Sequence, residues 1–102
     1  MIYVVARFIA AEGQRQSLLS AFAEIRPLVL KEKGCAAYAT SVDAQTDIKR
    51  QAPLEPEAVT LLEQWETLED LYAHIGASHM IAFREKNGHL IRSSELRICK
   101  NA

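Results

Sequence analysis

Most side chains that could do chemistry in this 102-residue sequence lie in one stretch, between Glu63 and Phe83. The stretch contains two histidines, His74 and His79, on either side of Gly76. An imidazole has an unperturbed pKa of about 6.5, so either histidine could take a proton near neutral pH as a general base. On a straight helix the two rings would point about 140° apart, whereas a helix break at Gly76 could direct both toward one site. We therefore predict His74 and His79 as candidate catalytic residues.

Two aromatic residues are candidates for the walls of a flat binding pocket. Trp65 is the only tryptophan in the chain, and Tyr38 lies in an earlier apolar segment. Large aromatic side chains serve core packing more often than binding. The sequence leaves both interpretations open for each residue.

Arg7 is a charged residue inside an otherwise apolar run of residues 2–10. A charge in such a run needs a partner of opposite sign, and we expect the carboxylate of Glu63 or Glu66 to be that partner. Arg7 is then a structural residue or, in the alternative interpretation, a substrate contact on the first strand.

Motifs that define many enzyme classes are absent from the sequence. It has no Gly-rich phosphate loop, no Cys-x-x-Cys pair, no His-Glu-x-x-His segment and no nucleophile elbow. The three histidines include no i, i+4 pair, so we predict no metal site.

The composition argues against two kinds of partner. Twelve Lys and Arg residues against 13 Asp and Glu residues leave a formal net charge of -1, so we expect neither nucleic acid nor a membrane surface as a partner. The N-terminal run is too short for a membrane span and lacks the basic start of a signal peptide. We expect a cytoplasmic protein with a single domain over residues 1–102.

Hydrophobic patterning predicts the strands that position these residues. Runs rich in β-branched and aromatic residues predict four strands, at residues 2–10, 35–42, 59–66 and 93–99. Residues 43–57 contain two prolines and show no apolar period, which predicts a mobile loop.

A 3.6-residue period predicts the helices. The longest helix covers about residues 14–32, and Pro27 should kink or split it. Thr67 opens a second helix with a capping box, and Ser78 could cap a third helix that runs to about Asn87.

This order of elements predicts an α+β fold of the ferredoxin-like, split βαβ type with a four-stranded antiparallel sheet. Helices cover one face of such a sheet, and on the last strand Leu96 and Ile98 should face inward. The other face would carry one of the two alternating sets of residues 2–10, either the set of Val4 or the set of Val5. Both sets are too apolar for a soluble monomer to expose, so we predict a homodimer with its sheets face to face.

Several segments of the sequence resemble the antibiotic biosynthesis monooxygenase family. They are Leu30–Cys35, Tyr38, Val42–Asp43, Glu63–Glu66, His74 and Ser78–Met80. The resemblance extends over nearly the whole chain, and within the family it is greatest to the small bacterial quinol monooxygenases.

The resemblance implies a dimeric α/β barrel with one pocket per subunit, and a cofactor-independent monooxygenase that oxidises an electron-rich aromatic substrate with molecular oxygen. The family's tryptophan on the third strand falls on Trp65, and its two helical histidines fall on His74 and His79. A haem-degrading branch uses an asparagine on the first strand, which Val5–Phe8 lacks. An isomerase relative acts on a phosphorylated sugar, which requires basic residues in the pocket. In this sequence Arg7 is the only candidate for such a residue on a strand.

An oxidation of this kind needs little machinery. A hydroquinone that loses a proton to His74 or His79 becomes a phenolate that can pass an electron to oxygen, so the protein supplies a base, a dry aromatic slot and orientation. The remaining contacts are expected from aromatic residues: walls from Trp65, Tyr38 and Phe83, and a hydrogen bond from Tyr72. The competing interpretation is a non-catalytic small-molecule-binding dimer, which would need neither histidine.

Overall fold

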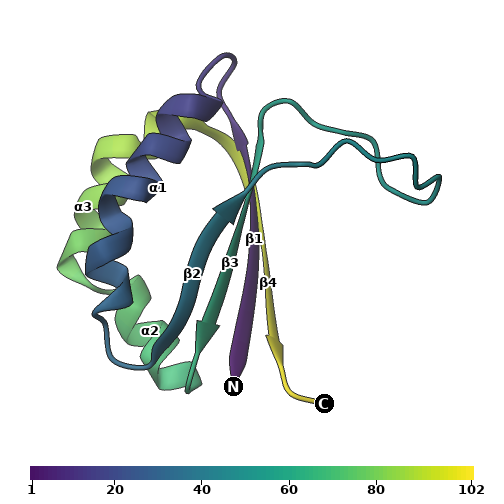
Figure 1. Ribbon diagram of the computed structural model, residues 1–102. Coiled ribbons are helices and arrows are strands. Elements are labelled where there is room, and N and C mark those ends of the chain that lie inside the picture. Colours follow the sequence, from purple (N-terminus) through teal and green to yellow (C-terminus); the bar gives the residue numbers. More distant parts are fainter.

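The computed structural model describes all 102 residues and contains four strands, three α-helices and one short 3-10 helix (Figure 1). The strands are β1 (Ile2–Ala10), β2 (Cys35–Ser41), β3 (Ala58–Trp65) and β4 (Ile91–Lys100). The helices are α1 (Arg15–Leu30), α2 (Leu68–Ile75) and α3 (Ser78–Asn87), and the 3-10 helix η1 (Gly88–Leu90) leads into β4.

The four strands form one antiparallel sheet in the order β2-β3-β1-β4. This is the strand order of a split βαβ unit, so the predicted ferredoxin-like α+β fold is confirmed. The sheet is open, with β2 and β4 at its edges, and the helices lie together on one side of it (Figure 1). None of the helices combines the length and the apolar character that crossing a lipid bilayer requires.

The helices cover the face of the sheet that carries the even-numbered residues of β1. Val4 and Ala6 are buried there, and Phe8 packs against the same core. Because side chains alternate along a strand, Tyr3 and Val5 point to the opposite face, where Tyr3 is exposed and Val5 is only partly buried. The set of Val5 is therefore the one on the bare face, which answers the alternative that the sequence left open.

Strand β4 lies at the edge that the helices leave uncovered. Leu96 and Ile98 pair with Ala6 and Val4 and so lie on the covered face of the sheet, as predicted. They nevertheless remain 58% and 50% exposed, because the helices pack mainly over the other three strands. The prediction that the two side chains face inward is thus confirmed, although neither side chain is buried.

Two details of the helices differ from the prediction. Helix α1 continues through Pro27 as one element and is not split, although Pro27 lacks the N–H that would donate to the carbonyl of Ala23. Thr67 caps α2 as predicted, accepting a hydrogen bond from Asp70 N at 3.1 Å. Ser78 does not cap α3, since Ala77 occupies the N-cap position and Ser78 is already helical.

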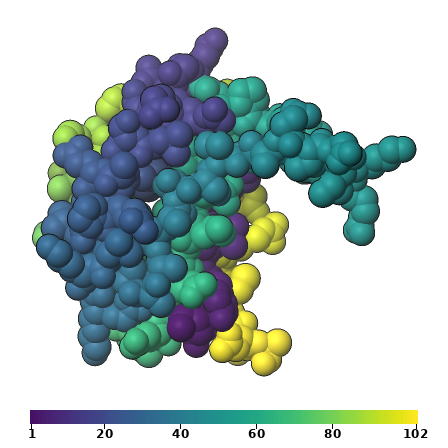
Figure 2. Space-filling view, viewed as in Figure 1, coloured from purple at the N-terminus to yellow at the C-terminus, as the bar shows by residue number.

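Residues 42–57, here called the arm, contain no helix or strand and project away from the helices (Figures 1 and 2). Apolar side chains lie exposed on it, among them Ile48 and Leu54. The arm therefore covers nothing on the helical side of the sheet.

Arg7 anchors the base of the arm on the bare face. Its Nη1 and Nη2 donate to the two carboxylate oxygens of Asp43, each at 3.0 Å, and Nη1 also donates to Thr60 Oγ1 at 3.0 Å. The prediction that Glu63 or Glu66 is the partner of Arg7 is therefore wrong. Arg7 pairs with Thr60 in the sheet and points away from the helices, whereas Glu63 is buried on the covered face.

Candidate active site

A cavity of about 600 Å³ lies between the covered face of the sheet and the helices. Ten of its 15 lining residues are hydrophobic, among them Phe8, Phe22, Met80 and Phe83. The exposed side chain of Leu96 also lines it, so the cavity opens to solvent beside β4. The site is thus an apolar slot that a flat ligand could enter from the uncovered edge of the sheet.

Tyr38 lines this cavity from β2 and carries a buried hydroxyl group. The residue is buried, and its Oη has no hydrogen-bond partner in the protein. Burial and the nearby carboxylates of Glu63 and Glu32 raise the pKa of Tyr38, so the hydroxyl keeps its proton. An orphaned, protonated hydroxyl can donate a hydrogen bond to a ligand oxygen, which would remove the cost of leaving it unpaired.

Glu63 lies directly opposite Tyr38 on the neighbouring strand β3 and also lines the cavity. Trp65, two residues further along and on the same face, donates its Nε1–H to Glu63 Oε1 at 2.9 Å. Burial raises the pKa of Glu63 in spite of this hydrogen bond. Trp65 is fully buried and does not line the cavity, so it supports the wall from behind.

His74 comes to the cavity from α2, and its side chain is only 5% exposed. Its ring packs against two aromatic rings, with centroids 4.6 Å from Trp65 and 5.8 Å from Tyr38. His74 Nε2 lies 3.8 Å from Glu63 Oε1, which is beyond hydrogen-bond distance. His74 Nδ1 contacts the carboxylate of Glu32 at 2.9 and 3.1 Å.

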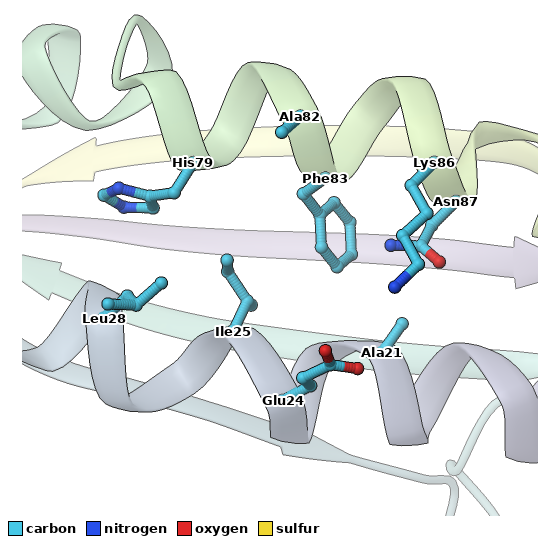
Figure 3. A pocket seen from close by; sticks show the side chains of 9 residues that line it. All are labelled: Ala21, Glu24, Ile25, Leu28, His79, Ala82, Phe83, Lys86 and Asn87. Carbon is cyan, nitrogen blue, oxygen red and sulfur yellow. The ribbon is translucent and has the colours of Figure 1, made fainter.

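His79 lies in a different place, in a groove of about 260 Å³ between α1 and α3 (Figure 3). Its ring neighbours Leu28 there, its side chain is 25% exposed, and it does not line the larger cavity. His79 Nε2 nevertheless contacts Glu32 Oε2 at 2.8 Å. The break at Gly76 thus directs both histidines to one carboxylate, while only His74 lines the cavity.

Three further residues were predicted from the sequence as substrate contacts. Phe83 lines the cavity and stacks on Phe22 with ring centroids 5.1 Å apart. Tyr72 lies on the exposed side of α2, and Arg7 lies on the bare face of the sheet; neither lines the cavity. Of these three, the structure brings only Phe83 to His74 and Tyr38.

Glu32 is the residue at this site that the sequence did not reveal. It is 42 residues from His74 and 47 from His79, so no local spacing connects them. One signal was present: Glu32 lies between Lys31 and Lys33 at the C-terminal end of a helix, where the helix dipole disfavours a negative charge.

The chemistry available here is proton transfer within an apolar space. The cavity combines a buried imidazole, an unpartnered phenol hydroxyl and a buried carboxyl group. No group of three or more His, Cys, Asp and Glu side chains is arranged to hold a metal ion. These groups suit a small hydroxyaromatic ligand that presents an O–H to His74.

Fold and site together define a ferredoxin-like α+β protein with an apolar, histidine-bearing cavity between its sheet and its helices. The chain belongs to the antibiotic biosynthesis monooxygenase family, whose model matches residues 1–86. This membership confirms the predicted family and, at the level of class, the predicted oxidoreductase of the monooxygenase type.

Individual relatives agree with this assignment. The probable quinol monooxygenase YgiN of Escherichia coli K12 is 40% identical over 87 residues, which cover 83% of this chain and 83% of YgiN. Among solved structures, a putative antibiotic biosynthesis monooxygenase from Deinococcus radiodurans has a TM-score of 0.82 at 16% identity, covering 100% of this chain and 93% of the other. A conserved protein from Methanosarcina mazei has a TM-score of 0.83 at 22% identity, covering 99% and 92%. The two solved structures show the fold alone.

Proposed function

We propose that this protein is a cofactor-independent monooxygenase that oxidises a quinol-type aromatic substrate with molecular oxygen, and that His74 is its base. The observation that carries the proposal is a buried imidazole on the wall of a mainly apolar cavity of about 600 Å³. The name of YgiN, a probable quinol monooxygenase, supports the quinol part. His79 lies outside this cavity and is not proposed as the base.

The cavity supports binding of a flat hydroxyaromatic ring. Phe22 and Phe83 offer stacked aromatic surface, and Tyr38 offers a hydroxyl with no partner in the protein. In the proposed complex one ring oxygen accepts a hydrogen bond from Tyr38 and one ring hydroxyl lies against His74 Nε2. The apolar lining excludes water, which strengthens both polar contacts.

The proposed reaction begins with proton transfer. The substrate O–H bond breaks, the proton forms a bond to His74 Nε2, and the oxygen keeps the electron pair as a phenolate. The phenolate then passes electrons to molecular oxygen. When one oxygen atom enters the ring, hydroquinone and O2 give a hydroxyquinone and water; when neither enters, they give quinone and hydrogen peroxide.

The bare face of the sheet supports a homodimer, which we propose as the assembly. Tyr3 and Leu62 are exposed on that face, next to the partly buried Val5 and Ala37. Stacking two such faces would bury an apolar surface that a monomer leaves in water.

The direct test is turnover by metal-free protein. We expect it to consume a naphthohydroquinone under oxygen faster than autoxidation, with label from ¹⁸O2 in the organic product. His74→Ala should lower kcat by about 100-fold or more, because general-base catalysis contributes about 10² to 10⁴ in rate. His89→Ala, which removes an exposed histidine, is the matched control and should stay within about twofold of wild type.

Two results would count against the proposal. Turnover that His74→Ala leaves intact would remove the base from the mechanism. Tight binding of the naphthohydroquinone with no turnover would favour the non-catalytic binding protein instead.

A further inference from the structure

Glu32 is held in a fixed turn between α1 and β2. Its backbone N–H donates to Val29 O at 2.9 Å, and its carbonyl accepts from Cys35 N at 3.2 Å. Gly34 completes the turn with φ +78°, a conformation that favours glycine. The backbone therefore fixes where the Glu32 side chain starts.

The carboxylate of Glu32 lies between the two histidines. It contacts His74 Nδ1 through both oxygens and His79 Nε2 through Oε2, at 2.8 to 3.1 Å. Glu32 itself does not line the cavity. It therefore acts on a bound substrate only through His74.

These contacts determine which nitrogen of each ring carries a proton. A carboxylate only accepts hydrogen bonds, so the ring nitrogens that face it, His74 Nδ1 and His79 Nε2, must be N–H donors. A neutral imidazole has one N–H, which leaves a lone pair on His74 Nε2. That nitrogen is on the edge of the ring toward Glu63, which lines the cavity.

We propose that Glu32 is a positioning residue for His74. It selects the tautomer with the proton on Nδ1, so that Nε2 is the nitrogen free to act as base, and its negative charge stabilises the imidazolium that forms when Nε2 takes the substrate proton. His79 holds the Glu32 carboxylate from the groove side through its own N–H. The inference rests on the proposed function, because it assigns a role in that same proton transfer.

The proposed proton transfer involves only the substrate and His74. The substrate O–H bond breaks and the His74 Nε2–H bond forms, while the Nδ1–H bond stays intact. The positive charge that appears on His74 then faces the negative charge of Glu32 at 2.9 Å. No proton needs to leave His74 before the substrate has lost its own.

A purely structural role is the competing explanation, since Glu32 also ties the turn after α1 to α2 and α3. The two roles differ in what they predict for the ring nitrogens of His74 and for kcat at saturating substrate. We therefore test them with Glu32→Gln, which keeps the size of the side chain. Glu24→Gln, an exposed acid on α1 that also lines the groove, is the matched control.

The first readout is the ¹⁵N NMR spectrum of the imidazoles in the protein without substrate. We expect a protonated Nδ1 and an unprotonated Nε2 for neutral His74 in wild type and in Glu24→Gln. In Glu32→Gln we expect a mixture of tautomers, because an amide can donate as well as accept. Observation of the Nε2–H tautomer in wild-type His74 overturns the inference, whether or not any variant folds.

The second readout is steady-state oxidation of a naphthohydroquinone. Glu32→Gln should lower kcat by about 10- to 100-fold with KM within about twofold, a part of what the base itself contributes. Glu32→Asp, which keeps the charge at a shorter reach, should recover part of that loss. His79→Gln, which keeps an N–H donor, should lose less than His79→Ala.

Failure of this inference can be told apart from failure of the proposed function. If His74→Ala removes turnover while Glu32→Gln retains full kcat and the wild-type tautomer, the positioning role is wrong and the base assignment stands. If His74→Ala retains turnover, the proposed function fails, and the NMR readout still decides whether Glu32 sets the tautomer of His74.

Discussion

The two faces of the sheet are built from alternate residues of the same strands, yet they hold charge in opposite ways. On the covered face, burial raises the pKa of Glu63, whose neighbours are the apolar lining of a cavity. On the bare face, hydrogen bonds from the Arg7 guanidinium lower the pKa of Asp43 to about 2. The covered face therefore disfavours the charged form of its carboxyl group, whereas the bare face holds a carboxylate that is paired with an arginine.

The two faces therefore differ in the role that we propose for each: the covered face carries the candidate active site, and the bare face carries the proposed dimer interface. The buried imidazole of His74 and the orphaned hydroxyl of Tyr38 lie on the covered side, where water is scarce. The paired charges of Arg7 and Asp43 and the exposed side chain of Leu62 lie on the other side, where a second copy could dock. The role of a charged residue in a strand can be assigned only when the face of the sheet on which it lies is known.

The largest expected effect concerns assembly through the bare face. Leu62→Asp should weaken dimerisation by about 100-fold or more, because it places an unpaired charge in the interface, and a change of about 1.4 kcal/mol is a factor of ten. Ile81→Asp is the matched control, since Ile81 on α3 is 45% exposed against 47% for Leu62. Sedimentation velocity measures both. A wild-type monomer, or equal effects of the two variants, would contradict assembly through this face.

A smaller effect is expected from one oxygen atom on the covered face. Tyr38→Phe removes a buried hydroxyl without a partner, so it should raise the free energy of unfolding by about 1 kcal/mol. The same change should raise KM for a naphthohydroquinone by about tenfold, the value of about one hydrogen bond to the substrate. Urea unfolding and steady-state kinetics check the two halves. A variant that is less stable than wild type and has an unchanged KM would show that the hydroxyl is not reserved for a ligand.

The smallest effect is expected from the ion pair on the bare face. Because the pKa of Asp43 is lowered by Arg7, its contribution to stability is complete above the ordinary Asp pKa of about 3.9 and disappears as the pH falls through about 2. The pair is partly exposed, so we expect about 1 kcal/mol or less. Urea unfolding of wild type and Asp43→Asn should differ most above pH 4 and converge toward pH 2. A difference that does not change with pH would contradict the pairing.

The sequence was sufficient to predict the order of elements and the ferredoxin-like fold, because both follow from local periodicity. Of the two effects predicted for Pro27, a kink or a split, the split is wrong, since α1 is one helix. The sequence also predicted the direction of Leu96 but not its exposure, since periodicity reports a side chain's face and not whether another element covers it.

The candidate site was only partly predictable, for the same reason. His74, Tyr38 and Phe83 were chosen by residue type and do line one cavity. The partner of Arg7 and the role of Glu32 depend on contacts 36 and 42 residues apart in the chain, which no local pattern encodes. Such pairs become visible only when the register of the sheet and the ends of the helices are known.

The most direct measurement is a crystal structure of the protein with a naphthohydroquinone bound in the absence of oxygen. We expect the ring in the cavity on the covered face, with one hydroxyl within hydrogen-bond distance of His74 Nε2 and the other oxygen near Tyr38 Oη. A ring bound instead in the groove beside His79, or on the bare face near Arg7, would contradict the assignment of His74 as the base.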